Sequence, residues 1–113
     1  MGNVKNGSAI PAAEAVSVAE WVSYQAGSVV SRQIVKQMKG NVTLFAFDEG
    51  QGLSEHTAPF DALVHVIDGE AEITISGKPI RTKAGEMVVM PANQPHALKA
   101  VSRFKMVLTM IRA

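Results

Sequence analysis

The stretch GQGLSEHTAPFDALVHVIDG, residues 50–69, decides the fold of this chain. A glycine-rich turn opens it, His56 follows, and a run rich in branched apolar residues ends at Asp68 and Gly69, a dipeptide typical of turns. After His56, apolar residues recur at every second position, as they do on the inward face of a strand. The stretch therefore predicts a turn, an inward-facing histidine and a return strand.

A second stretch of the same kind, GEMVVMPANQPH, covers residues 85–96. It begins with a glycine turn, continues as a strand, passes through two prolines and ends at His96. Leu98 and Ala100 then follow with the spacing of an inward-facing strand surface. Two histidines directed into one interior predict a binding site.

The rest of the chain also has the pattern of β-structure. Residues 29–38 and 41–48 are rich in branched and aromatic residues, and Lys39-Gly40-Asn41 between them predicts a hairpin. The second of these runs is apolar on both faces, which predicts a strand covered on both sides. Further strands are predicted over residues 63–67, 71–76, 79–83, 87–91, 96–101 and 104–111. About eight or nine short strands without a long helix predict an all-β fold, an antiparallel sandwich or small barrel.

The N-terminal region has a different character. Residues 1–14 are small, polar or turn-forming and show no periodicity, so we predict a flexible leader followed by a single domain over residues 15–113. Residues 15–24 predict either one short helical turn or an extended edge segment, and Ser17 with Glu20 fits a capping box. Trp21 is predicted to pack against the barrel.

Composition narrows the class of protein. The chain has 113 residues, of which 47% are hydrophobic, and this is enough for one core but not for two. The net charge is +1 and the basic residues are scattered, so we expect neither nucleic acid nor a membrane surface as a partner. The absence of cysteine excludes disulfides and thiolate chemistry. With no membrane-spanning run and no signal-peptide pattern, the sequence predicts a cytoplasmic protein.

The first stretch resembles the first motif of the cupin superfamily, a group of jelly-roll β-barrels that usually bind one divalent metal. That motif runs glycine, five residues, His-x-His, three or four residues, Glu, six residues, glycine. This chain matches its spacing with Gly50, His56 and Gly69, but Ala58 stands at the second histidine position and Ala62 at the glutamate position.

The second stretch resembles the second cupin motif, which runs glycine, five residues, Pro-x-Gly, two residues, His, three residues, Asn. Gly85, Pro91 and His96 match this spacing, while Asn93 replaces the second glycine and Ala100 the asparagine. The resemblance covers residues 50–100. It implies an antiparallel jelly-roll barrel in a small single-domain cupin.

The resemblance also implies a metal site, in which cupins hold iron, manganese, nickel, zinc or copper with three histidines and a glutamate. Only His56 and His96 carry over here, so a metal needs a further ligand, and His65 is the third candidate. Strand alternation places His65 on the outer face, in a dimer interface or sheet contact, unless a bulge near residues 59–61 reverses it. The alternative is that His56 and His96 bond to each other or to water without metal.

Several inward positions predict a mostly apolar pocket with a polar patch at the two histidines. Methionines at strand positions contribute to it, and its predicted ligand-contacting residues are Phe45, Phe60, Val64 and Met90. Such a pocket favours a small ligand that is largely apolar or aromatic.

These observations lead to three hypotheses of function. The first is a small-molecule-binding cupin with a reduced divalent-metal site, which in its enzymatic version is a metal-dependent dioxygenase or isomerase. The second is a metal-free ligand-binding or sensing module without catalytic activity, and the third is a purely structural dimer. The strand that is apolar on both faces, together with Trp21, further predicts a homodimer formed by sheet packing.

Overall fold

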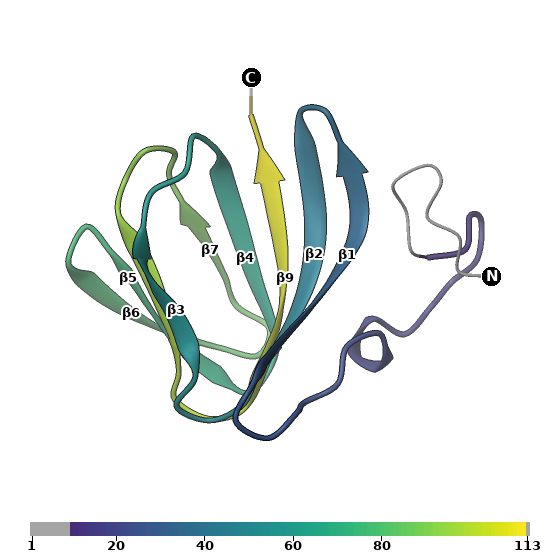
Figure 1. The fold of residues 1–113 in the computed structure, drawn as a ribbon, viewed down its shortest axis with the longest axis horizontal. Helices are drawn as coiled ribbons and strands as arrows, with labels where there is room; N and C mark the ends of the chain where they lie inside the picture. The colour runs from purple at the N-terminus through teal and green to yellow at the C-terminus, as the bar shows by residue number, and fades with distance from the viewer. Residues whose placement is uncertain (1–9, 113) are drawn as a thin grey trace.

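The computed structural model describes residues 10–112, which form nine β-strands and a single turn of 3-10 helix, η1 (Val18–Glu20) (Figure 1). The strands follow one another with short connections. In chain order they are β1 (Val29–Gln37), β2 (Gly40–Phe47), β3 (Gly52–His56), β4 (Asp61–Asp68), β5 (Glu70–Ile75), β6 (Lys78–Lys83), β7 (Met87–Met90), β8 (His96–Ala100) and β9 (Phe104–Ile111).

The strands form two sheets that face each other (Figure 1). The larger has the order β1-β2-β9-β4-β7 and the smaller the order β3-β8-β5-β6, and neighbouring strands run antiparallel throughout. From β2 to β9 the chain crosses between the sheets at every connection except the β5–β6 hairpin, which is the topology of a jelly roll. The predicted all-β jelly roll of eight or nine strands is thereby confirmed, as two sheets.

The turn between β4 and β5 fits tightly against another part of the backbone. Gly69 has a φ of +73°, a conformation that glycine adopts without steric cost. Its Cα lies against the backbone of Arg103 and Phe104, where a β-carbon would overlap the Arg103 carbonyl oxygen. The turn residue that the sequence marks therefore also sets how closely the β8–β9 connection approaches β4.

The space between the sheets is filled mainly by aromatic and branched side chains. The Phe47 and Phe104 rings stack with centroids 4.4 Å apart, and Phe45 stacks on Phe47 at 5.7 Å. Phe47, Phe104, Val64 and Val66 are fully buried in this cluster. This packing occupies much of the interior, so only a small volume is left for a site.

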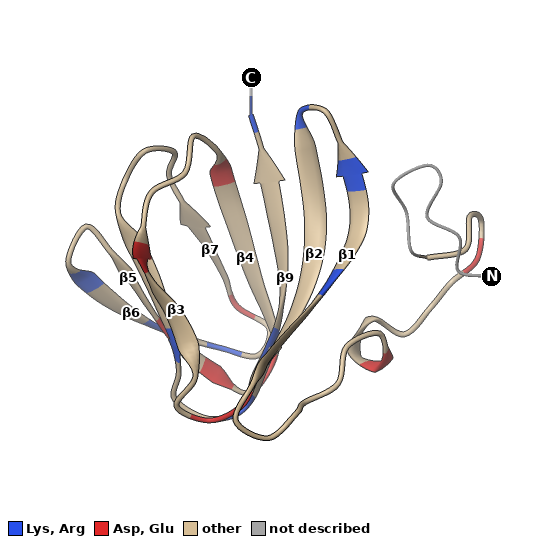
Figure 2. Cartoon of the chain, viewed as in Figure 1, with Lys and Arg blue, Asp and Glu red and all other residues tan. Residues whose placement is uncertain are grey.

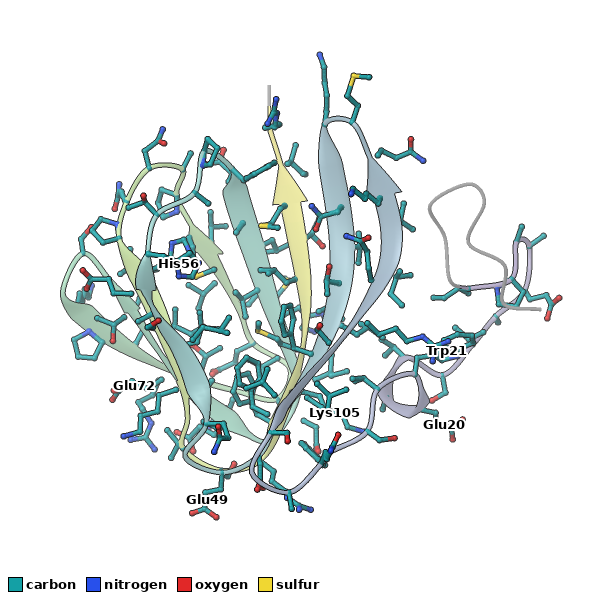
Figure 3. All side chains as sticks on the ribbon, in the orientation of Figure 1. Glu20, Trp21, Glu49, His56, Glu72 and Lys105 are labelled. Atoms are coloured by element: carbon teal, nitrogen blue, oxygen red, sulfur yellow. The ribbon has the colours of Figure 1, made fainter. Side chains whose placement is uncertain are left out.

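A second apolar cluster lies on the outside of the larger sheet. Leu44 and Ala46 of β2 are buried there against Val22, and Trp21 is partly buried beside them (Figure 3). The Arg32 guanidinium lies 4.3 Å from the centre of the Trp21 ring. The predicted packing of Trp21 is confirmed, and the second apolar face of β2 is covered by the chain's own N-terminal segment. That face therefore gives no support to a dimer.

Hydrogen bonds tie this N-terminal segment to the sandwich. Asp48 accepts from the Gly27 N–H at 2.7 Å and from Arg103 Nε at 2.9 Å, and Lys105 Nζ donates to the Ala19 carbonyl at 2.7 Å. The Gly27 N–H, followed by Arg103, holds the pKa of Asp48 below its usual value. The bonds at Ala19 and Gly27 hold the segment against the sandwich at these two residues.

The helical turn predicted near Ser17 is present as η1, but the capping box is not. The Ser17 carbonyl accepts from the Glu20 N–H at 3.0 Å, while its side chain makes no capping bond to the described residues. Most of the predicted leader, residues 1–9, lies outside the described residues. Across residues 10–112, no helix combines the length and the apolar character that crossing a bilayer requires.

Candidate functional site

The four motif positions meet at one small cavity between the sheets. His56, Ala58, Ala62 and His96 all line it, although they come from β3, the loop after β3, β4 and β8. Its volume is about 40 Å³. Room of this size suits an ion or one or two water molecules. The structure thus brings the four motif positions together around one space.

A β-bulge in β3 directs His56 into the interior. Leu53 pairs with Leu98 and His56 with His96, so three steps along β3 correspond to two along β8. The extra residue places Leu53 and His56 on the same, inward side of the strand. Figure 3 shows His56 projecting from β3 toward the space between the sheets. The bulge lies before the histidine, not at residues 59–61.

The two histidines approach each other through the same ring nitrogen. Their Nε2 atoms are 3.1 Å apart, and their rings meet edge to face at an interplanar angle of 70°. Each Nδ1 contacts the carbonyl two residues earlier, Ser54 for His56 at 2.8 Å and Gln94 for His96 at 3.1 Å. The two side chains are therefore held in matching orientations by their own strands.

These contacts determine where the ring protons lie. A carbonyl oxygen can only accept, so both Nδ1 atoms carry hydrogen, and each neutral ring then presents a bare lone pair at Nε2. Two lone pairs facing each other at 3.1 Å attract only if a cation lies between or beside them. Metal-binding histidines are oriented in this way, with the other ring N–H donated to a carbonyl.

Burial affects the two rings differently. His96 is buried, whereas His56 lies at the exposed mouth of the cavity. Burial has the largest influence on His96 and lowers its pKa; the hydrogen bond to the Gln94 carbonyl acts in the opposite direction, and His56 lowers the pKa further. His96 is therefore kept neutral, with its Nε2 lone pair available.

The remaining walls of the cavity are apolar and rich in sulfur. Ala62 pairs with Met90 on one side, in β7, and with Met110 on the other, in β9. Both methionines line the cavity, as do Met106, Leu53, Leu98 and Leu108. The alanine at the glutamate position is thus flanked by two thioether side chains. Strand alternation in the sequence places Met90 and Met110 inward but does not pair them with Ala62.

Of the four residues predicted to contact a ligand, the structure brings Met90 to the cavity and places the other three elsewhere. Val64 and Phe45 belong to the packed cluster around the Phe47 and Phe104 rings. Phe60 lies in the loop before β4, with the Arg112 guanidinium 5.6 Å from its ring centre. The prediction for Phe60 depends on one continuous inward face from His56 onward, but residues 57–60 are a loop.

His65 is not brought to the other two histidines. It lies between the buried Val64 and Val66 and pairs with Met87 and Val107, so it occupies the outer face of the larger sheet. In the part of the chain that the structure describes, no group of three His, Cys, Asp or Glu side chains is placed to hold a metal. A third ligand at the cavity must come from another residue type or from outside the chain.

A larger hollow of about 380 Å³ lies on the outer surface, along β3, β8 and β5. It is open to solvent, and its charged lining residues Glu72 and Lys99 are cross-strand neighbours. It contains neither histidine. The small internal cavity, where four motif positions and two oriented imidazoles converge, is the better candidate for function.

Comparison with solved structures shows close likeness over nearly the whole chain. A conserved protein of unknown function from Streptococcus pyogenes is 36% identical, with a TM-score of 0.88, over 92% of this chain and 91% of the other. A cupin superfamily protein from Desulfitobacterium hafniense is 26% identical, with a TM-score of 0.87, over 96% and 97%. The sequence matches no curated protein.

A third structure matches part of a longer chain. A cupin 2 conserved barrel domain protein from Leptotrichia buccalis is 43% identical, with a TM-score of 0.81, over 83% of this chain but 46% of that one. The family described as "Cupin domain" matches residues 43–112, which include both histidines. The chain therefore belongs to the cupin domain family.

Proposed function

We propose that this cupin domain binds one transition-metal ion between His56 and His96. The observation that carries the proposal is the pair of Nε2 atoms, 3.1 Å apart, whose rings are both oriented by carbonyl acceptors. Two imidazole nitrogens on one tetrahedral zinc ion lie about 3.3 Å apart, given metal–nitrogen bonds of about 2.0–2.1 Å. The observed separation is close to that value, so the pair needs little adjustment to hold a metal.

The motif residues can supply about half of the ligands that a metal ion needs. His56 and His96 supply two ligands, while Ala58 and Ala62 supply none, so the other positions remain for groups outside the family's usual set. A metal held here would supply a Lewis acid with open positions. The chain itself contributes two fixed imidazoles and a mostly apolar wall.

The volume of the cavity favours a domain that binds a metal ion over an enzyme that converts an organic substrate. Pockets for organic ligands usually measure about 300–1,000 Å³, whereas this one measures about 40 Å³. A small aromatic or aliphatic molecule therefore enters only if side chains such as Met90 and Met110 move. We accordingly propose a metal-binding module, and we rank the dioxygenase and isomerase versions of this site below it.

The proposal predicts that tag-free protein, after reconstitution, holds about one equivalent of a transition metal. His56→Ala and His96→Ala are each expected to reduce it below about a tenth of an equivalent, because a single imidazole does not retain a metal against competing ligands. Elemental analysis after dialysis against a weak chelator measures this.

His65→Ala is the matched control, since it removes the third histidine, which lies on the outer face of the other, larger sheet. It is expected to leave the metal content unchanged. If no metal is retained by the unsubstituted protein, or if His65→Ala loses it as the other two variants do, the metal proposal is wrong. The metal-free module, with a proton between the two rings, then becomes the better account.

We also propose that the domain is a homodimer that packs through the outer face of β4 and β7, formed by Leu63, His65, Ile67, Met87 and Val89. Met87 and Val89 are 61% and 57% exposed, and they pair with His65 and Leu63. Figure 2 shows β7 without charged residues and β4 with charges only toward its ends. Two copies can pack such a face together without like-charge repulsion, which makes a second copy the suitable partner.

The dimer proposal predicts a mass in sedimentation of twice the 12.0 kDa chain. Val89→Lys is expected to convert it to monomer, because it places two lysines in one apolar interface. Met38→Lys is the control, since Met38 is 90% exposed near the β1–β2 turn, away from this face. A monomer before any substitution, or a dimer that survives Val89→Lys, contradicts the proposed interface.

A further inference from the structure

We infer that the cavity is a site for a soft monovalent cation, Cu(I), bound by the His56 and His96 imidazoles together with the thioethers of Met90 and Met110. This inference rests on the proposed metal site and names the ion and the additional ligands. It assigns to the two methionines a role that the family's two motifs do not include.

The sheet register places both thioethers around the position that the family gives to a carboxylate. Ala62 is the cross-strand partner of Met90 on β7 and of Met110 on β9, and residues paired in this way have β-carbons about 4.5–5.5 Å apart. Both side chains line the same cavity as the two histidines. The alanine leaves the space between them free.

The methionine side chain is suited to complete such a site. It is unbranched, with three rotatable bonds and a polarizable sulfur, so it can turn its sulfur toward an ion with little rearrangement of the backbone. Met90 is 2% exposed and Met110 is partly buried, so both side chains lie largely out of solvent. Strands β7 and β9 hold the two residues on either side of β4.

The two imidazoles and two thioethers favour Cu(I) over other metal ions. Thioether sulfur favours Cu(I), and imidazole favours copper, zinc, iron and nickel, whereas magnesium, calcium and manganese prefer oxygen ligands. Two imidazoles and two thioethers are all neutral, and the described residues place no carboxylate on the cavity. The site therefore supplies soft donors and no compensating negative charge.

The small size and low polarity of the cavity also favour Cu(I) over a divalent ion. The solvation cost of burying an ion rises with the square of its charge, so a divalent ion costs roughly four times as much as a monovalent one in the same apolar site. A volume of about 40 Å³ leaves no room for the several waters that a hard divalent ion keeps. A bare Cu(I) ion lowers the first cost about fourfold and has no such waters to accommodate.

The test is an anaerobic titration of the metal-free protein with Cu(I), in the presence of a chromogenic Cu(I) chelator as competitor. The combined Met90→Leu and Met110→Leu variant is expected to bind Cu(I) at least about tenfold more weakly, while its affinity for Zn²⁺ changes less than threefold. Leucine conserves the side-chain volume, so the fold is expected to persist. Circular dichroism and thermal melting of each variant check this. X-ray absorption of the loaded protein should show sulfur in the first shell.

Controls separate the two proposals. Met38→Leu changes an exposed methionine and is expected to leave Cu(I) affinity unaltered. If the two histidine variants lose metal but the methionine variant binds Cu(I) normally, or if no sulfur is seen, the thioether inference is wrong and the two-histidine site stands. If the unsubstituted protein binds neither Cu(I) nor Zn²⁺, the proposed metal function fails, and this inference fails with it.

Discussion

Gly69→Ala is expected to prevent the domain from folding. An alanine β-carbon at this position would overlap the Arg103 carbonyl oxygen and lie 2.8 Å from the Phe104 Cα, and both neighbours are backbone atoms that no rotamer change can move. The φ of +73° adds the conformational cost of a left-handed residue. Since Phe104 anchors the aromatic stack, any displacement of this backbone also disturbs the core. We expect a loss of more than about 4 kcal/mol, a size confined to a few severe mechanisms.

Gly77→Ala is the matched control for this prediction. Gly77 also has a positive φ, +82°, but a β-carbon there meets no atom within 4 Å. Only the backbone preference is lost, so the expected cost is about 1–2 kcal/mol. Soluble yield and urea denaturation compare the two variants. If Gly69→Ala is destabilised by no more than Gly77→Ala, the close approach of the β4–β5 turn to residues 103 and 104 is wrong.

Restoring the two replaced positions is expected to create a tight divalent-metal site. Ala58→His and Ala62→Glu together add an imidazole and a carboxylate to the cavity that His56 and His96 already line. Loss of even an outer-shell partner of a metal ligand costs about 10–100-fold in affinity. Two added ligands should therefore raise Zn²⁺ affinity at least about a hundredfold, as isothermal titration can measure.

The metal-free form of this double variant should be much less stable than the unsubstituted domain. A glutamate forced into a cavity of about 40 Å³ between two methionines overpacks the interior and buries an acidic group. We expect a cost of about 3 kcal/mol or more from these two effects. Excess Zn²⁺ should recover about 2.7 kcal/mol at 100 times its Kd. Thermal melting with Zn²⁺ and with a chelator measures both changes.

Adding His96→Ala to the double variant tests whether the four positions act together. Its Zn²⁺ affinity should fall back by at least about tenfold, because one of the converging ligands is gone. An affinity that does not depend on His96 would mean that the new ligands bind metal elsewhere.

The sequence is sufficient to predict most of the architecture, because the strands are marked by period-two patterns and the turns by glycine-containing dipeptides such as Asp68-Gly69. Motif spacing also predicts that Ala58, Ala62 and the two histidines meet, although two of the four carry no ligand. Spacing succeeds here because turn length and strand length fix where each position lies along the barrel.

Other features could not be predicted, because they depend on how far along the interior a side chain lies and on the local conformation of the backbone. Alternation tells which side of a strand faces inward but not how far along the interior a residue lies. Phe45 and Val64 are therefore predicted to contact a ligand, but they lie in the packed core. The bulge before His56 has no glycine or proline at Ser54 or Glu55 to mark it. The orientation of the rings depends on two carbonyl groups whose positions only the fold defines.

The N-terminal segment that covers β2 has a consequence for how such domains can change during evolution. The family match begins at residue 43, yet Leu44 and Ala46 are buried against Val22, which lies outside that match. A larger side chain at either β2 position is tolerated only if a side chain of the N-terminal segment that packs on it becomes smaller. A larger side chain in the segment likewise requires a smaller one on β2. Among relatives, these positions are therefore expected to covary across the boundary of the shared domain, so that the covering segment and the outer surface of the sheet are inherited as one unit.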